Sequence, residues 1–335
     1  MKTEPTLLDY SLAQLTSELE KISAPAYRSR QIWNALYQRL AISFDDLTDL
    51  PSDLRHYLAE RYRILPAEPV LEQVSADGST EKVLLRLIDG ELIEAVLMRY
   101  AASKNGRRRN TVCVSTQAGC AMACSFCATG QQGFRRNLSL GEIVEQVLHY
   151  ARRLRGEGDQ VTNIVFMGMG EPFANYDATL QSVRTLNAPA GFGLGARHMT
   201  ISTVGLVNGI RRLAEEPVQV GLALSLHAPN DELRRRLIPT ARQPIAAILS
   251  ACNAYAAATG RRYSIEYALI DGVNDSIELA HSLAALLRGL ACHVNLIPVN
   301  PTANADSRRP GRARVPTLRS EIVSEGIKCP IHMEE

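Results

Sequence analysis

The spacing of hydrophobic and polar positions changes twice along this chain. Up to about residue 65, apolar residues recur at helical intervals, and the segments 11–19, 25–37 and 46–58 are predicted to form amphipathic helices. Ser11 followed by Gln14 is typical of a capped helix start. From residue 70 to 98 the period becomes that of strands, with the hairpin dipeptides Asp77-Gly78 and Asp89-Gly90 between the runs. We therefore expect a helical domain over residues 1–65, followed by a β extension.

From Thr111 on, apolar runs of strand type alternate with helical patterns such as 139–155 and 276–288. Alternating strands and helices predict a parallel sheet. We expect α/β architecture, a partial (β/α)6 barrel over residues 111–335, with the β extension and a basic loop occupying 66–110. In such folds the chemistry lies at the C-terminal ends of the strands. The predicted strands are 111–115, 161–167, 198–202, 218–225, 263–269 and 292–298.

Composition narrows the class of protein. The chain has 335 residues, 46% of them apolar, which is enough for a sizeable core. It contains no apolar run of 18 residues, and its first residues lack the layout of a signal peptide. Seven cysteines, three of them clustered, fit reduced metal ligands better than a disulfide framework. We expect a cytoplasmic monomer without membrane segments.

The basic residues are unevenly distributed. Net charge is only +2, but five lysines stand against a large excess of arginine, which occurs in clusters. Guanidinium groups suit phosphate and stack on bases, although any single cluster is more often a solvated helix face. Several clusters near a candidate catalytic loop favour RNA as a partner, and the loop 99–110 is either RNA-facing or a solvated insertion. The clusters are 107–109, 135–136, 152–153, 211–212, 234–236, 261–262 and 308–309.

Three cysteines follow the first strand of the alternating region, as Cys120-Ala-Met-Ala-Cys124-Ser-Phe-Cys127. Thiolates bind iron–sulfur clusters, and three local cysteines hold three corners of a four-iron cube, leaving one iron open to a small molecule. Two alternatives are a structural zinc site with a distant fourth ligand and three unrelated buried cysteines. Zinc ribbons normally have two C-x2-C pairs, and no second pair occurs here.

The predicted strand ends carry further polar motifs. The second strand ends in Gly168-Met-Gly170-Glu171, where glycines let a ligand approach the backbone and a carboxylate can accept from an ammonium group. A Gly-x-Gly motif alone is weak evidence, but its place after a strand strengthens it. Elsewhere, Tyr27, Trp33 and Tyr37 are predicted to be core side chains, as are Cys252 and Cys292.

These motifs together resemble one family. The C-x3-C-x2-C spacing is the signature of radical S-adenosylmethionine (SAM) enzymes. The stretches Cys113-Val-Ser-Thr-Gln-Ala-Gly-Cys120, Phe126-Cys-Ala-Thr-Gly-Gln-Gln-Gly-Phe134 and Arg136-Asn-Leu138 resemble the RlmN/Cfr type, which methylates adenine in ribosomal RNA. Asp271-Gly-Val-Asn-Asp275 and Asn295-Leu-Ile-Pro-Val-Asn300 are further markers, and the resemblance extends from about residue 28 to 328.

The resemblance implies roles for individual residues. It implies a [4Fe-4S] cluster on Cys120, Cys124 and Cys127. Glu94 corresponds to the family's proton acceptor, and Cys113 to a second mechanistic cysteine that resolves the protein–RNA adduct. The residues that correspond to SAM contacts are Gly170, Glu171, Ser202, Ser225, Leu226, His227 and Asn300.

The resemblance also implies the reaction and its partners. One SAM molecule methylates a cysteine near the C-terminus. A second SAM molecule gives a 5′-deoxyadenosyl radical, which activates this methyl group for addition to an adenine carbon. C2 is the carbon expected first. The hard chemistry belongs to the cofactor. Ribosomal RNA is the expected substrate, with transfer RNA as a second candidate, and the electron comes from a low-potential donor. The helical domain is expected to help grip RNA.

One expected residue lies outside the sequence. Counted from Asn300-Pro301, the methyl-accepting cysteine falls beyond Glu335, and Cys329 comes too early, so we interpret Cys329 as structural. Either the sequence is truncated or the protein is a natural variant without a methyl carrier. The alternative function is therefore a homologue that binds cluster and SAM without methylating, or a radical SAM enzyme with another substrate.

Overall fold

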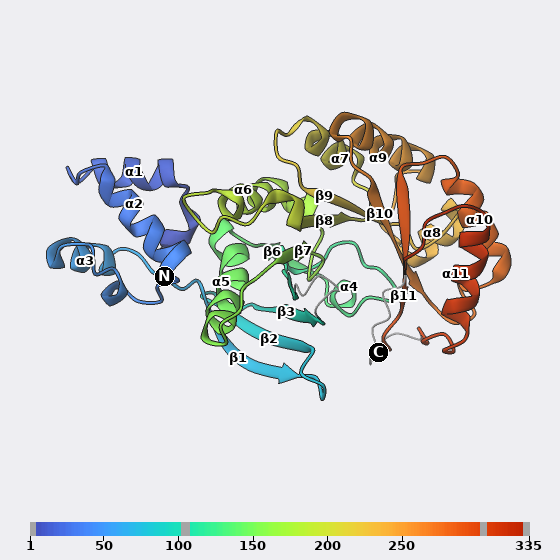
Figure 1. The fold of residues 1–335 in the computed structure, drawn as a ribbon, viewed down its shortest axis with the longest axis horizontal. Coiled ribbons are helices and arrows are strands. Elements are labelled where there is room, and N and C mark those ends of the chain that lie inside the picture. Colours follow the sequence, from blue (N-terminus) through green and yellow to red (C-terminus); the bar gives the residue numbers. More distant parts are fainter. Residues whose placement is uncertain (1–4, 102–107, 302–306, 331–335) are drawn as a thin grey trace. The chain divides into compact units, whose positions relative to one another are not determined.

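Three short helices form the N-terminal region of the computed structural model, which describes residues 5–101, 108–301 and 307–330 (Figure 1). They are α1 (Leu12–Glu20), α2 (Tyr27–Asn34) and α3 (Ser52–Ala59). The predicted cap of α1 is confirmed, because the Ser11 side chain accepts from the Gln14 N–H and the Gln14 side chain accepts from the Ser11 N–H. Shorter helical turns are η1 (Leu7–Asp9), η2 (Ala35–Arg39), η3 (Phe44–Asp46), η4 (Pro172–Asn175) and η5 (Ala196–His198).

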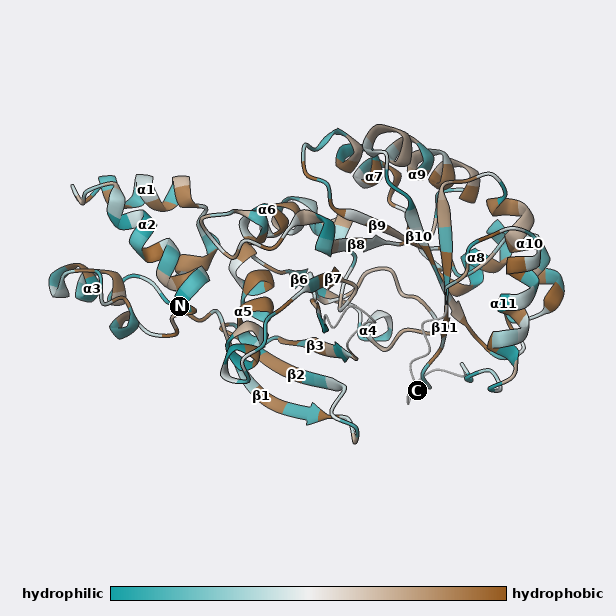
Figure 2. Cartoon of the chain, viewed as in Figure 1, coloured by the Kyte–Doolittle hydropathy of each residue, from teal (hydrophilic) through white to brown (hydrophobic). Residues whose placement is uncertain are grey.

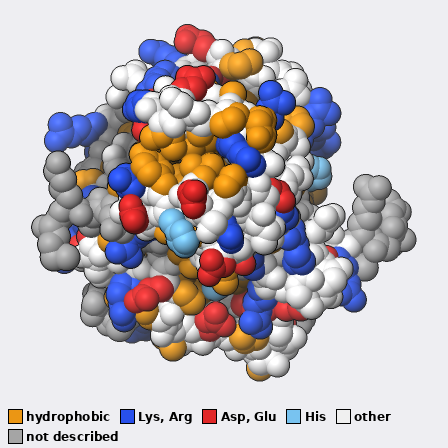
Figure 3. All heavy atoms as spheres, turned by 90° about the vertical axis from the view of Figure 1, so that its left-hand side faces the viewer, with side chains coloured by type: hydrophobic (Ala, Val, Ile, Leu, Met, Phe, Trp, Pro, Cys, Tyr) orange, Lys and Arg blue, Asp and Glu red, His pale blue; other side chains and the backbone are white. Residues whose placement is uncertain are grey.

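The three aromatic residues of this region differ in burial. Trp33 and Tyr37 are buried, as predicted, with ring centroids 4.4 Å apart. Tyr27 is 51% exposed, so its prediction as a core residue is wrong. It is the first residue of α2, and the Arg28 guanidinium lies 4.8 Å from its ring centroid. On the face drawn in Figure 3, other apolar side chains also reach the surface, in a patch with charged groups around it.

Two compact units divide the chain. The first consists of residues 1–118, 136–169 and 175–199, and the second of 119–135, 170–174 and 200–335. In the first, β1 (Ala67–Val74), β2 (Thr80–Leu87), β3 (Leu92–Tyr100) and β4 (Arg109–Cys113) form an antiparallel sheet in chain order, and β7 (Asn163–Phe166) pairs with β4 in parallel. The predicted turns contain Gly78 and Gly90, at φ +71° and +90°.

The predicted basic loop 99–110 is shorter than expected. Arg99 pairs with Asn110 and Tyr100 with Arg109, so both ends of the segment belong to strands β3 and β4. A cross-strand ladder satisfies their backbone groups, which a loop would leave to solvent. The middle of the predicted loop, residues 102–107, lies outside the described residues.

Helix α5 (Leu140–Gly156) covers one face of this sheet. Its predicted capping box is present, with Ser139 and Glu142 bonded reciprocally. Its apolar stripe, brown in Figure 2, includes Ile143, Val147 and Leu154, all buried. The Tyr150 hydroxyl donates to the Glu81 carbonyl at 2.8 Å and lies 3.0 Å from that of Ala95. Helix α6 (Tyr176–Asn187) packs on α5.

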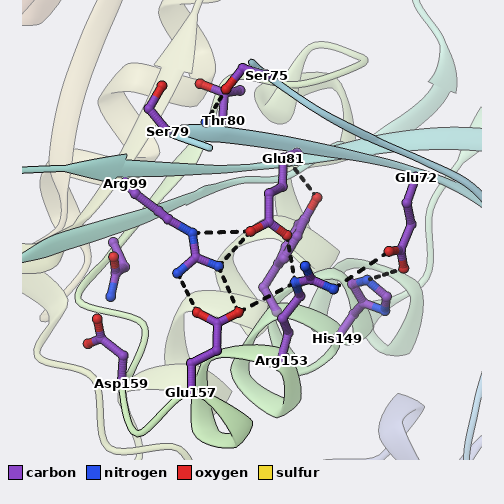
Figure 4. A network of polar contacts seen from close by, with 12 residues as sticks. Glu72, Ser75, Ser79, Thr80, Glu81, Arg99, His149, Arg153, Glu157 and Asp159 are labelled. Carbon is purple, nitrogen blue, oxygen red and sulfur yellow. Dashed lines mark hydrogen bonds and ion pairs between the residues drawn. The ribbon is translucent and has the colours of Figure 1, made fainter. Parts of the chain in front are cut away.

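An ion-pair network joins strands β2 and β3 to the C-terminal end of α5 (Figure 4). Arg99 donates to Glu81 at 2.6 Å and to Glu157 at 2.7 Å, and Arg153 donates to Glu81 at 2.7 Å. Their guanidinium groups already have carboxylate partners. For Arg153, one of the clustered arginines, the structure therefore favours a structural role over a phosphate contact.

The second unit contains four parallel strands: β8 (Met199–Thr203), β9 (Gly221–Ser225), β10 (Tyr263–Leu269) and β11 (Cys292–Pro298). The order β8-β9-β10-β11 follows the chain, as expected of βα units. The Tyr263 hydroxyl of β10 donates to Asn253 Oδ1 of α9 at 3.1 Å. The helices of this unit are α7 (Val207–Glu215), α8 (Asp231–Leu237), α9 (Ile245–Thr259), α10 (Ile277–Leu287) and α11 (Arg314–Ser324).

Three cysteines belong to the packing of this unit. Cys252 and Cys292 are buried, as predicted for core residues. Cys329 is also buried, but residues 327–330 form no strand; the segment is attached through the Lys328 carbonyl, which accepts from Val294 N at 2.8 Å. Among the described helices, none is long and apolar enough to cross a membrane.

Candidate cluster and cofactor site

The cysteine loop is closed at its base by two glycines. Cys120 N donates to Gly133 O at 3.0 Å, next to the short strands β5 (Gln117–Gly119) and β6 (Phe134–Asn137). Gly119 has φ +72°, and a Cβ there would lie 1.9 Å from Gly133 O. Only glycine therefore fits at position 119. The sequence between these two glycines forms a loop that contains all three clustered cysteines.

The loop is anchored to the region of helix α8. Ser125 N donates to Leu237 O at 2.9 Å, and Thr240 Oγ1 donates to Met122 O at 2.9 Å. Cys124 packs in one apolar cluster with Leu237 and its neighbours. Cys127 precedes the short helix α4 (Ala128–Gln131), in which a Cβ on Gly130 would lie 2.8 Å from Cys124 N. These contacts fix the path of the loop and thereby the positions of its three thiols.

The chemistry of the thiols fits a bound metal cluster. Cys120 and Cys124 are about nine-tenths buried and Cys127 is half-buried. Burial raises the pKa of Cys120, and it raises that of Cys124 to about 12, with the neighbouring cysteines adding to the effect. A buried thiolate is stable only when a cation binds it. No three His, Cys, Asp or Glu side chains of the described ranges are arranged around a single ion, whereas a four-iron cluster takes one thiolate per iron.

Glu171 lies in the second unit at the turn after the glycines. Gly170 has φ +101°, and the Glu171 side chain is only 2% exposed. Its Oε2 accepts from Val204 N at 2.9 Å and its Oε1 from Phe173 N at 3.1 Å. Burial raises the pKa of Glu171 to about 7, although these hydrogen bonds act in the opposite direction. The carboxylate is thus oriented by two backbone N–H groups, and the charge of Arg234 also favours its ionised form.

Polar residues line one face of the parallel strands. Ser202 and Ser225 have their Oγ atoms 3.1 Å apart. In the register, Ser225 lies opposite Glu266, and Glu266 opposite Asn295. Glu266 Oε1 accepts from Ser264 Oγ at 2.8 Å and from Asn295 Nδ2 at 2.9 Å. The two serines were predicted, whereas Glu266 was missed; its signal is a carboxylate in the middle of a β run that contains no other charged residue.

His227 follows this face, with left-handed backbone at φ +61°. Its Nδ1 accepts from Ala268 N at 2.9 Å, and its ring packs edge-on against Phe126 of the cysteine loop at 4.9 Å. Burial lowers the pKa of His227 to about 3, so the ring is neutral. Leu226 is fully buried, and its N–H donates to Glu266 O at 3.1 Å. Asn300 is exposed and accepts from Arg309 at 3.2 Å.

Arg234 is the second residue that sequence reasoning missed. The cluster 234–236 was interpreted as a solvated face or an RNA contact, but Arg234 is 2% exposed while Arg235 and Arg236 are exposed. Arg234 donates to Val204 O. The available signal was helical spacing, since position 234 lies one turn before Leu237 and Ile238 on the apolar face of α8.

Glu94 and Cys113 belong to the first unit and lie on the same face of its sheet. Val96 pairs with Cys113 across β3 and β4, and Glu94 is two residues before Val96 on the same strand. Lys82, opposite Val96 on β2, places its Nζ 2.9 Å from Glu94 Oε1. Ser115 Oγ donates to the Glu94 carbonyl at 2.6 Å, which fixes the backbone. The sequence alone gave no signal for the Lys82 contact.

The chain is similar to known proteins over most of its length. Two family models match, "Radical SAM superfamily" over residues 114–283 and "Ribosomal RNA large subunit methyltransferase N-terminal domain" over residues 6–64. Ribosomal RNA large subunit methyltransferase N from Nitrosopumilus maritimus is 48% identical over 96% of this chain and 93% of its own. A probable dual-specificity RNA methyltransferase RlmN from Chloroflexus aurantiacus is 49% identical over 98% and 89%.

A solved structure extends the likeness to the fold. The crystal structure of a radical SAM methyltransferase from Sphaerobacter thermophilus matches with a TM-score of 0.94 and 50% identity, covering 98% of this chain and 95% of that one. Identity of this size over nearly the whole length goes beyond a shared architecture. The chain therefore belongs to the RlmN family of radical SAM methyltransferases and is an enzyme.

Proposed function

We propose that this enzyme methylates C2 of an adenine in ribosomal RNA, with transfer RNA as a second substrate. The observation that carries the proposal is the grouping of the cysteine loop, Glu171 and the Ser202–Ser225 pair within one unit. The relatives named above are RNA methyltransferases, which supports RNA as the substrate. The enzyme acts as a monomer and receives its electron from a low-potential donor.

Cys120, Cys124 and Cys127 hold three irons of a [4Fe-4S] cluster in this proposal. When bound and reduced, the cluster supplies the electron that cleaves SAM to a 5′-deoxyadenosyl radical. The chain itself positions the thiolates and limits the access of water, because the loop packs against the apolar side chains around Cys124. His227 keeps Phe126, and with it the loop, in place.

The remaining site residues bind and orient SAM. Glu171 accepts a hydrogen bond from the ammonium group of the methionine moiety, since both of its oxygens are already aimed by backbone N–H groups. Gly170 gives the ligand access to the backbone. The hydroxyls of Ser202 and Ser225 and the amide of Asn300 bind polar groups of the nucleoside and carboxylate. Leu226 supports this part of the site by holding the end of β9 against β10 through its N–H to Glu266 O.

Glu94 and Cys113 act on the RNA. Glu94 accepts the proton that leaves the adenine carbon once the new bond has formed, and Lys82 orients its carboxylate. In the family's reaction a methyl-carrying cysteine near the C-terminus joins the RNA in a covalent adduct, and Cys113 resolves this adduct. Their place on one face of the sheet, two residues apart in register, supports joint action on the same base.

The test is methyl transfer under anaerobic conditions. The protein is expressed from its complete gene, so that any residues coded after Glu335 are included, and is then reconstituted. It is incubated with dithionite, SAM carrying a labelled methyl group, and either protein-free ribosomal RNA or transfer RNA. We expect labelled 2-methyladenosine in nuclease digests, and none with the Glu94→Gln variant. SAM cleavage without label in any adenosine of either RNA would contradict the proposal and point to another substrate. Label on a different adenine carbon would contradict the C2 assignment alone.

A further inference from the structure

A buried arginine lies beside the cysteine loop and takes no part in the function proposed above. Arg234 in α8 is 2% exposed, although Arg235 and Arg236 on the same helix are exposed. Burying a guanidinium removes most of its hydration, at a cost of several kcal/mol unless other charges or hydrogen bonds compensate. The burial of Arg234 therefore raises the question of which group, in the protein or in a ligand, compensates its charge.

The protein partners of Arg234 are few and do not neutralise it. Nη2 donates to the Val204 carbonyl, and Nε is buried without a hydrogen-bond partner. In the described part of the chain no carboxylate forms an ion pair with it. Asp231, the acidic residue with the largest effect on its charge, uses Oδ1 to accept from Ile245 N at 2.8 Å. The guanidinium is therefore not neutralised by a direct ion pair, although the nearby charges of Asp231 and Glu171 favour its protonated form.

This charge lies next to the candidate cluster ligands. Leu233 and Leu237, on either side of Arg234 in α8, pack in the same apolar cluster as Cys124. Val204, which accepts from Arg234, donates its own N–H to Glu171. The positive charge opposes the effect of burial on the thiol of Cys124 and on Glu171, because it favours their negative forms. Arg234 is thus a fixed cation in contact with the walls of the site.

We propose that Arg234 is the counter-charge of the iron–sulfur cluster, stabilising its reduced form and so raising its reduction potential. The proposal rests on cluster binding by the three cysteines. In the reduction step one electron passes from a low-potential donor to the cluster, and no bond forms or breaks. The cluster site therefore gains one negative charge. A unit positive charge roughly 10 Å away, in a medium of effective dielectric constant about 20, changes this equilibrium by about tenfold.

The experiment compares Arg234→Met, which removes the charge at similar size, with Arg234→Lys, which keeps it. The exposed neighbours provide the matched controls Arg235→Gln and Arg236→Gln. Each protein is reconstituted anaerobically, and its iron and sulfide content, circular dichroism and midpoint potential are measured, the potential by dithionite titration followed by electron paramagnetic resonance. Iron content of the wild type tests cluster binding itself, independently of Arg234.

We expect Arg234→Met to bind four irons and to show about tenfold less reduced cluster at a fixed potential, a shift of 59 mV for one electron. The lysine variant and both controls should match the wild type. An Arg234→Met protein with four irons and the wild-type potential overturns the proposal. If the methionine variant loses its cluster, a lysine variant that keeps cluster and potential supports the role of charge, and a lysine variant that also loses the cluster overturns it.

Discussion

Replacing Glu171 with glutamine tests how the site binds SAM. The side chain keeps its size but loses its negative charge and one hydrogen-bond acceptor. A charge-assisted hydrogen bond to an ammonium group contributes about 1.5–3 kcal/mol, so the variant should bind SAM about 10- to 100-fold more weakly. The effect on folding must be worked out separately, since a misfolded variant would also fail to bind.

For folding, two effects oppose each other. The pKa of Glu171 is raised from 4.5 to about 7, which corresponds to about 3 kcal/mol. A raised carboxyl pKa means that the folded state holds its proton more tightly. The contribution of protonated Glu171 to the free energy of unfolding is therefore fully present below pH 4.5, declines as the pH rises to about 7, and is absent above pH 7. The Glu171→Gln variant avoids that loss, but an amide nitrogen facing Val204 N or Phe173 N costs about 1–3 kcal/mol.

The net change in stability above pH 7 is thus expected to be small, while SAM affinity falls. Calorimetric titration of the reconstituted proteins with SAM at pH 7.5, together with thermal melts, separates the two quantities. Glu232→Gln, an exposed position on α8, is the matched control. Between pH 6 and 8 the affinity ratio of wild type to Glu171→Gln should grow, and titration of SAM itself cancels in that ratio. Equal affinity of both proteins at pH 7.5 would refute the assigned contact.

Three further predictions concern other parts of the molecule. Gly119→Ala should prevent cluster assembly, because its Cβ would lie 1.9 Å from Gly133 O. Gly133→Ala, also at positive φ but with open space around it, should still bind iron. Iron analysis of the two reconstituted variants tests this difference. Cys113→Ser should bind wild-type amounts of iron yet accumulate a protein–RNA adduct on denaturing gels. Arg99→Met should lower the free energy of unfolding by about 1–2 kcal/mol in denaturant titrations, since the Glu81 side chain is only 10% exposed; an unchanged midpoint would show that Arg153 alone suffices.

Local patterns predicted much of the fold. Strands β10 and β11 have the predicted bounds, because continuous apolar or alternating runs leave little choice of structure. The capping boxes at Ser11 and Ser139 were predictable for the same reason, since both partners lie within one helical turn. The spacing of the clustered cysteines also predicts that they share one loop, and the structure shows this loop closed between Gly119 and Gly133.

Features that depend on tertiary contacts were harder to predict. The ends of the loop 99–110 pair as strands because β3 and β4 lie side by side, which composition does not show. Arg234 was grouped with its exposed neighbours, although its burial depends on which face of α8 meets the cysteine loop. The contact between Lys82 and Glu94 depends on the register of two strands. In each case the deciding partner is distant in sequence.

The most direct test of the account is reductive cleavage of SAM by the reconstituted protein. With dithionite and SAM under anaerobic conditions, the wild type should release 5′-deoxyadenosine, measured by liquid chromatography, and should show the broad visible absorbance of a [4Fe-4S] cluster. The Cys124→Ser variant should show neither, and the buried-core variant Cys252→Ser should show both. A wild-type protein that binds no iron, or a Cys124→Ser variant that still releases 5′-deoxyadenosine, would contradict the account.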